Sequence, residues 1–177
     1  VGTSPNVSII SCKGASNTSP SDGISFAYDQ IKYAAEVGAD IINASWGSPG
    51  SGTYPNSIVN YATSLGALVV TAAGNDNLEH NATYQDYPAD CTNALCVAST
   101  GQGDIKSNFS DYGAAVDVCA PGEGIVSTII GGTGYNSYSG TSMSSPVVAG
   151  VCALVKSLNP ELTPAELMQR VMDTADY

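Results

Sequence analysis

The strongest constraint on the fold is an alternation of short apolar runs with segments of helical periodicity. The runs Val7–Cys12, Ile41–Ser45 and Leu68–Ala72 are rich in apolar residues and bounded by turn residues, which predicts buried strands. Helical segments separate them, and Gly38 and Gly66 supply the left-handed residue that ends each helix. Connections of this kind join parallel strands through right-handed crossovers. The sequence therefore predicts an α/β fold with a doubly wound, mostly parallel sheet and helices on both faces.

Further elements are expected in the second half of the chain. Strand-like runs occur at Leu95–Ser99, Val116–Cys119 and Ile125–Ile130, and a helical pattern at Thr141–Leu158. The tetrad beginning at Thr163 predicts a last helix with a capping box and with proline at its first position.

The first helix is expected to begin at a serine cap, either Ser19 or Ser21. Its apolar face consists of five residues, Ile24, Ala27, Tyr28, Ile31 and Ala35. The sequence shows no internal repeat and no low-complexity linker, so residues 1–177 are expected to form one domain.

Charge narrows the range of partners. Five Lys and Arg residues against 16 Asp and Glu residues give a formal net charge of −11, the wrong sign for phosphates or anionic lipids. Nucleic acids and membrane surfaces are therefore excluded as partners, whereas metal cations are not. No apolar run approaches the roughly 18 residues of a membrane span. Sequons at Asn6, Asn17, Asn43, Asn81 and Asn108 fit a secreted or extracellular protein.

The cysteines leave two readings open. Their number is odd, five, and no Cys-x-x-Cys spacing suggests a zinc site. Cys91 and Cys96 frame a polar loop and could close a short disulfide. The alternative is that all five are free thiols; Cys12, Cys119 and Cys152 lie in apolar runs, where cysteine behaves as a small hydrophobic residue.

Three segments are expected to meet at one edge of the sheet, because ligands of parallel sheets bind beyond the carboxyl ends of the strands. They are Ser45–Gly47, Ala72–Asn75 and Gly140–Met143. Taken alone, Ser142 could be a plain helix cap and Asn75 a turn residue. A serine at a helix N-terminus could equally use the free N–H groups there to stabilise a developing anion.

These segments carry a family resemblance. The run GTSMSSPVVAG at Gly140–Gly150 resembles the serine box of the subtilisin-like serine proteases, the subtilases. Ala72–Asn75 is similar to the family's Ala-Ala-Gly-Asn segment, and Ser45–Gly47 to its Ser-x-Gly segment. Tyr87-Pro88-Ala89 and Ala120-Pro121-Gly122 match in the same order, so the resemblance covers essentially all 177 residues.

The resemblance implies a role for each matching residue. Ser142 would be the nucleophile that forms an acyl-enzyme, and Asn75 would donate its side-chain amide to the oxyanion together with the Ser142 N–H group. Substrate peptide would bind between two segments: Ser45, Trp46 and Gly47 on one side, and Ala72, Ala73 and Gly74 on the other. No cofactor is required for this chemistry.

The resemblance also raises points that stay open. Asp117 and the Ala89 carbonyl match a position where the family often binds a structural calcium or other cation. Trp46 could be a pocket wall or a core aromatic. Asp76 and Asp86 flank a loop that lines the family's substrate pocket; they could favour a basic side chain there, or be solvated loop carboxylates.

The family's catalytic aspartate and histidine motifs are absent, and His80 is the only histidine. We expect these residues on an N-terminal segment of the same protease, so that this chain alone is essentially inactive. The likeness also stops short of the family's last strand and helix. Two alternatives remain: a pseudoprotease that acts as a peptide- or protein-binding module, and a structural, cation-binding extracellular domain.

Overall fold

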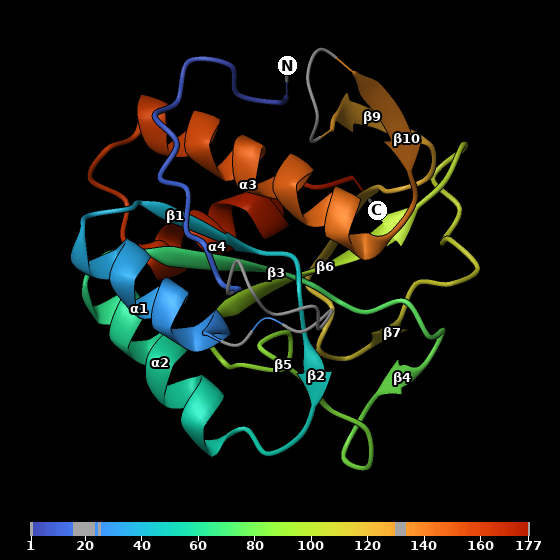
Figure 1. Cartoon of the computed structure of the whole chain (residues 1–177), viewed down its shortest axis with the longest axis horizontal. Helices are drawn as coiled ribbons and strands as arrows, with labels where there is room; N and C mark the ends of the chain where they lie inside the picture. Colours follow the sequence, from blue (N-terminus) through green and yellow to red (C-terminus); the bar gives the residue numbers. More distant parts are fainter. Residues whose placement is uncertain (1, 16–23, 25, 130–133, 177) are drawn as a thin grey trace.

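Four parallel strands form the central sheet of the computed structural model, which describes residues 2–15, 24, 26–129 and 134–176. The spatial order of the strands is β1-β3-β6-β8 (Figure 1). Their bounds are Ile41–Ala44 for β1, Leu68–Ala72 for β3, Ala94–Thr100 for β6 and Val118–Pro121 for β8. All three pairings are parallel, which confirms the predicted sheet.

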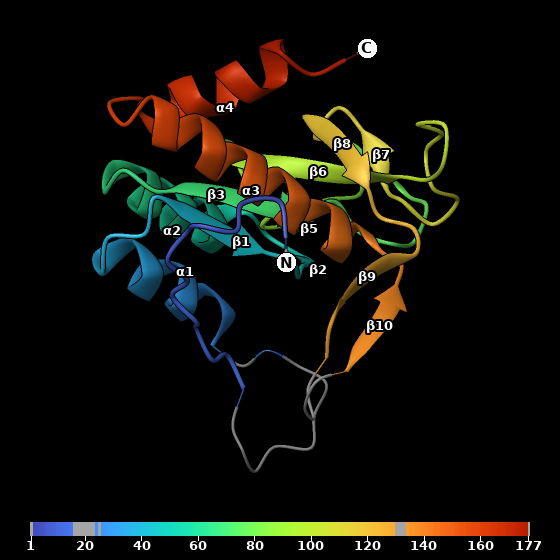
Figure 2. The same ribbon diagram turned by 90° about the horizontal axis from the view of Figure 1, so that it is seen from above.

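Helices cover both faces of this sheet (Figure 2). Helices α1 (Ala27–Glu36) and α2 (Thr53–Ser64) pack on one face, while α3 (Thr141–Leu158) and α4 (Pro164–Asp173) pack on the other. Strand β3 is buried along its whole length, because its side chains point alternately into the two cores. The doubly wound prediction is confirmed.

The predicted helix ends are also present. Gly38 and Gly66 follow α1 and α2 with φ of 87° and 94°, a conformation that only glycine adopts at little cost. Thr163 accepts a hydrogen bond from the Glu166 N–H group, and the Glu166 carboxylate accepts one from the Thr163 N–H group at 2.9 Å. The two hydrogen bonds that Thr163 donates to this carboxylate, first from its N–H group and second from its Oγ1, hold the pKa of Glu166 below its usual value.

The predicted strand at Val7–Cys12 is wrong. Residues 7–12 are extended but join no sheet, and Ile9 is 86% exposed. Within the described residues β1 pairs only with β3, and the segment crosses the outside of α3 and β1 (Figure 1). An apolar segment becomes a strand only where it pairs with the edge of a sheet, and the local sequence does not determine whether that pairing forms.

The start of α1 and the smaller sheets differ in detail from expectation. The proposed caps Ser19 and Ser21 lie outside the described residues, as does the Asn17 sequon, and Ile24 precedes the helix. Three two-stranded sheets flank the core: β2 (Ser48–Pro49) with β5 (Asp86–Tyr87), β4 (Glu79–His80) with β7 (Tyr112–Gly113), and β9 (Ile125–Thr128) with β10 (Tyr135–Tyr138). The strand expected at Ile125–Ile130 thus ends at Thr128, and β10 was not foreseen.

Cys91 and Cys96 are free thiols, so the disulfide reading is wrong. Cys91 packs in the core between the sheet and α1 and α2, whereas Cys96 lies within β6 in a separate cluster with Ala73 and Ala89. Burial raises the pKa of Cys91 to about 12 and also raises that of Cys96. Both behave as small hydrophobic residues.

Helix α3 is long and apolar enough to cross a membrane when length and composition are considered alone, which the sequence prediction did not recognise. Its contacts explain the composition, because it packs against β1, β3, β6 and β8.

Candidate active site

The carboxyl ends of β1 and β3 meet the N-terminus of α3, as the parallel topology requires. Ser142 is the second residue of α3. Its Oγ donates a hydrogen bond to the backbone carbonyl of Ser45, 3.1 Å away and just beyond the end of β1. The structure thus brings the candidate nucleophile beside the candidate substrate segment Ser45–Gly47.

Asn75 lies beside the same helix N-terminus. Its Oδ1 accepts hydrogen bonds from the Thr141 N–H group at 2.9 Å and from Thr141 Oγ1 at 3.1 Å. A backbone N–H group can only donate, so the atom facing Thr141 must be the amide oxygen. The side-chain amide nitrogen of Asn75 therefore points away from Thr141 and keeps its hydrogens for another acceptor.

Thr141 is a positioning residue that the sequence analysis did not single out. Its side chain is fully buried. Besides its bonds to Asn75, its Oγ1 accepts a hydrogen bond from the Gly74 N–H group at 3.2 Å. Thr141 therefore joins the loop after β3 to the N-terminus of α3, directly before Ser142. The serine box contains this threonine, but its partners lie 66 and 67 positions away along the chain.

Asn43 is a second residue of this kind. Its side-chain nitrogen donates to Ser45 Oγ at 2.9 Å, and its side-chain oxygen accepts from Ser145 Oγ at 2.7 Å. It was noted in the sequence only as a sequon. In the structure it joins the end of β1 to the N-terminal part of α3.

The two candidate substrate segments differ in exposure. Ala72 and Ala73 are buried at the end of β3, whereas Gly47 is exposed. Trp46 is partly buried against the core between the sheet and α1 and α2, and its ring meets Tyr28 edge to face at 5.0 Å. These contacts are those of a core aromatic.

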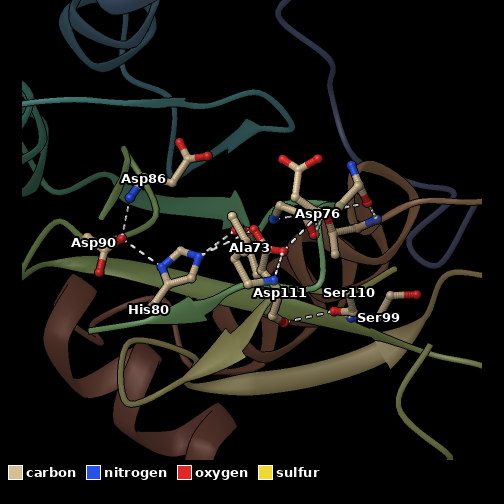
Figure 3. A network of polar contacts seen from close by, with 12 residues as sticks. Ala73, Asp76, His80, Asp86, Asp90, Ser99, Ser110 and Asp111 are labelled. Atoms are coloured by element: carbon tan, nitrogen blue, oxygen red, sulfur yellow. Dashed lines mark hydrogen bonds and ion pairs between the residues drawn. The ribbon is translucent and has the colours of Figure 1, made fainter. Parts of the chain in front are cut away.

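His80 does not lie at Ser142. It is 2% exposed, and both ring nitrogens face acceptors (Figure 3). Nδ1 lies 2.7 Å from Asp90 Oδ2, and Nε2 lies 2.9 Å from the Ala73 carbonyl and 3.7 Å from Asp111 Oδ2. Because a carbonyl oxygen can only accept, Nε2 donates to Ala73. Both nitrogens are thus engaged away from Ser142.

The two loop carboxylates are not alike. Asp76 is exposed, but Asp86 is 9% exposed and lies against Gly47, where an added side-chain carbon would collide with it. Burial is the main cause that raises the pKa of Asp86 to about 6. Asp86 is therefore not the solvated loop carboxylate that its sequence context allowed.

At the candidate cation site, formed by Asp117 and the Ala89 carbonyl, the Asp117 carboxylate is hydrogen-bonded to the backbone. Asp117 Oδ2 accepts a hydrogen bond from the Cys96 N–H group at 2.7 Å, and burial raises the pKa of Asp117. Ala89 belongs to the same small cluster as Cys96. Among the described residues, no group of three His, Cys, Asp or Glu side chains is arranged to hold a metal. A cation at Asp117 and Ala89 stays a prediction.

Comparison with known proteins assigns the family. The family model described as "Subtilase family" matches residues 1–177. Alkaline elastase YaB from Bacillus sp. (strain YaB) is 40% identical over 177 residues, which are 99% of this chain and 45% of that protein. Subtilisin amylosacchariticus from Bacillus subtilis subsp. amylosacchariticus is 36% identical, over 100% of this chain and 46% of that protein.

Solved structures agree. A protease from Pseudoalteromonas arctica PAMC 21717 superposes with a TM-score of 0.78 at 34% identity, over 85% of this chain and 51% of that one. A cold-adapted subtilisin-like serine proteinase gives 0.74 at 36% identity, over 80% and 51%. The chain spans about half the length of the relatives that it matches. With its parallel sheet and serine box, this chain belongs to the subtilase family of serine proteases.

Proposed function

We propose that these residues form the serine-bearing part of a secreted serine endopeptidase. Ser142 Oγ attacks the scissile carbonyl and forms an acyl-enzyme, while the Asn75 side-chain amide and the Ser142 N–H group bind the oxyanion. The observation that carries the proposal is the junction at Thr141, which holds the Asn75 amide oxygen and is followed directly by Ser142.

Substrate binding follows from the backbone around this junction. An extended peptide adds as a strand along the backbone of Ser45–Gly47, and Ala72–Gly74 forms the opposite wall of its binding site. Ser45 is already within hydrogen-bond distance of Ser142 Oγ. A peptide bound along this segment would therefore present its carbonyl groups to the nucleophile.

The general base must come from outside these 177 residues. The one histidine, His80, is buried and uses both nitrogens in other contacts. We propose that the catalytic aspartate and histidine lie on an N-terminal segment of the same protein, which is also a partner of this chain. Loss of the base costs about 10⁶ in turnover, a value measured in a subtilisin, so the chain alone is essentially inactive.

The engagement of His80 also favours a second candidate, a catalytically inactive member that binds peptides or proteins in the same cleft. The two candidates differ in one property: only the protease needs a histidine and an aspartate elsewhere in the protein. In both, the site is extracellular, no cofactor is required, and any calcium or other cation at Asp117 and Ala89 is structural.

The test uses the full-length protein with Ser142→Ala. Peptide hydrolysis and labelling by a fluorophosphonate should both be lost, while the melting temperature stays within a few degrees. Ser157→Ala is the matched control, because Ser157 is exposed near the other end of α3 and bonds only within that helix. Labelling that persists in Ser142→Ala would place the nucleophile elsewhere. An unlabelled wild-type protein that still binds peptides would favour the second candidate.

A further inference from the structure

Asn75 is the residue whose geometry the proposed chemistry depends on most. Thr141 fixes the orientation of the Asn75 side-chain amide, but the backbone of Asn75 lies in an exposed loop after β3. An oxyanion donor contributes only if it is already in place when charge develops, because reorganising it during the reaction would cost the stabilisation it provides. Something must therefore hold the backbone on both sides of Asn75.

Asp111 does this on two sides. Its Oδ1 accepts hydrogen bonds from the N–H groups of Asp76 at 2.9 Å and Leu78 at 2.8 Å, which follow Asn75. Its own N–H group donates to the carbonyl of Gly74, which precedes Asn75, at 3.1 Å. Gly74 has φ of 121°, and a side chain there would collide with the Asp111 carboxylate. The loop and the carboxylate are thus fitted to each other.

His80 adds the third attachment. Its Nε2 donates to the Ala73 carbonyl at 2.9 Å and lies 3.7 Å from Asp111 Oδ2, an oxygen with no hydrogen-bond partner among the described residues. Asp90 fixes the other side of the ring through Nδ1 at 2.7 Å. The imidazole, two carboxylates and the Ala73 carbonyl thus form one layer beneath the loop (Figure 3).

The charges explain why these two residues act together. Asp111 is fully buried, and a buried carboxylate without a cation is costly. Lys106, the lysine nearest in sequence, donates to Asn77, Ser107 and Ser110 instead. Among the described residues, His80 is the basic side chain that lies within 4 Å of the Asp111 carboxylate, with 3.7 Å between Nε2 and Oδ2.

We propose that the buried His80–Asp111 pair is the positioning element of the oxyanion hole, holding the backbone on both sides of Asn75 so that its amide faces the reacting carbonyl. The inference rests on the proposed function. His80 and Asp111 are positioning residues, because they act through Asn75 and touch no substrate.

The test is a double-mutant cycle in the full-length protein. Asn75→Ala should lower kcat by about 10² to 10³, the size measured for loss of such a donor in a subtilisin. His80→Ala should lower kcat by about 10-fold to 100-fold with little change in KM, as expected for a displaced catalytic group. In the Asn75→Ala background the same change should lower kcat less than about threefold, because its target is gone. Rates are expressed per active site titrated with a fluorophosphonate, which removes the effect of unfolded protein.

Two further variants keep the cycle interpretable. If His80→Ala does not fold, His80→Gln replaces it, since glutamine can still donate to the Ala73 carbonyl and should give a smaller loss of kcat. Leu167→Ala is the structural control: it removes a fully buried side chain of α4 from the core that α3 and α4 form with the sheet. It should lower stability by about 2 to 5 kcal/mol but leave kcat per titrated site unchanged.

The possible failures are distinct. Equal losses of kcat from the His80 change with and without Asn75 would overturn the positioning role while leaving the protease proposal intact. An unchanged kcat in His80→Ala would overturn it as well. If Asn75→Ala itself left kcat unchanged, the oxyanion assignment would fail, and the inference with it.

Discussion

At the scale of single residues, the orientation of the Asn75 side-chain amide is set by the Thr141 N–H group, which can only donate a hydrogen bond. The Thr141 N–H group cannot accept, so Asn75 must present its oxygen to it and keeps its amide nitrogen for another acceptor. The serine box and the Gly-Asn segment were both recognisable in the sequence. Their contact was not, because 66 positions separate Thr141 from Asn75. Sequence motifs identify such groups, but only the fold sets their relative orientation.

The buried ionic layer could not be read from the sequence for the same reason. The sequence analysis noted His80 only as the single histidine of the chain. Its partners Asp90 and Asp111 lie 10 and 31 positions further along the chain, and nothing local marks them. A lone histidine among many carboxylates gives no signal of which ones it will meet.

Asp86 leads to a prediction about stability. Its folded pKa of about 6 lies above its ordinary value of 3.8 because of burial, with Asp111, Asp90 and Asp76 raising it further and His80 opposing them. The folded state therefore binds this proton more tightly than the unfolded state. The free energy of unfolding should fall as pH rises from about 4 to about 6, by up to about 3 kcal/mol from this group.

Asp86→Asn should remove the cost of burying an ionised carboxylate at this position. It should raise the free energy of unfolding at pH 8 by about 1 to 3 kcal/mol, with little change at pH 4. Urea denaturation at the two pH values measures it. Glu79→Gln, an exposed change of the same charge, should stay within about 0.5 kcal/mol of wild type at both. A loss of stability at pH 8 in Asp86→Asn would show that the carboxylate is favourably paired.

At the scale of elements, the predictions succeeded where the sequence carries its own start and stop signals. The bounds of β3 and α3 and the capping box of α4 are as predicted. The failures are segments whose state depends on a distant partner. Val7–Cys12 has strand composition but pairs with no strand, and β10 is polar at its centre and pairs only because β9 lies beside it.

The helix stops give a test at this scale. Gly38→Ala should lower the free energy of unfolding by about 1 to 2 kcal/mol, since φ of 87° is strained for alanine while the site has open space around it. Gly50→Ala is the matched control, because Gly50 also has open space but no such φ. Chemical denaturation of both variants measures the difference. Equal effects would mean that the left-handed conformation does not determine where α1 ends.

At the scale of the whole molecule, the sheet places the proposed nucleophile Ser142 and the proposed oxyanion donor Asn75 at one edge, and within the described residues no histidine lies beside them. The only histidine, His80, is hydrogen-bonded to Asp90 and to the Ala73 carbonyl. This separation predicts that the site is assembled from two parts of one protein. The family assignment from sequence was confirmed over the whole chain, whereas the source of the base stays a prediction.

A comparison of labelling rates addresses this prediction. The isolated 177-residue chain should react with a fluorophosphonate several orders of magnitude more slowly than the full-length protein, because Ser142 has no base in the chain alone. Circular dichroism of the isolated chain serves as the folding control. Labelling at the full rate in a folded isolated chain would show that another base exists within these residues.

The central claim is that Ser142 and Asn75 hold one carbonyl from two sides. The most direct measurement is a crystal structure of the full-length protein after reaction with a fluorophosphonate, whose phosphoryl oxygen stands in for the oxyanion. The account predicts phosphorus bonded to Ser142 Oγ, with that oxygen about 3 Å from both the Asn75 side-chain nitrogen and the Ser142 N–H group. An adduct on another residue, or a phosphoryl oxygen turned away from Asn75, would contradict it.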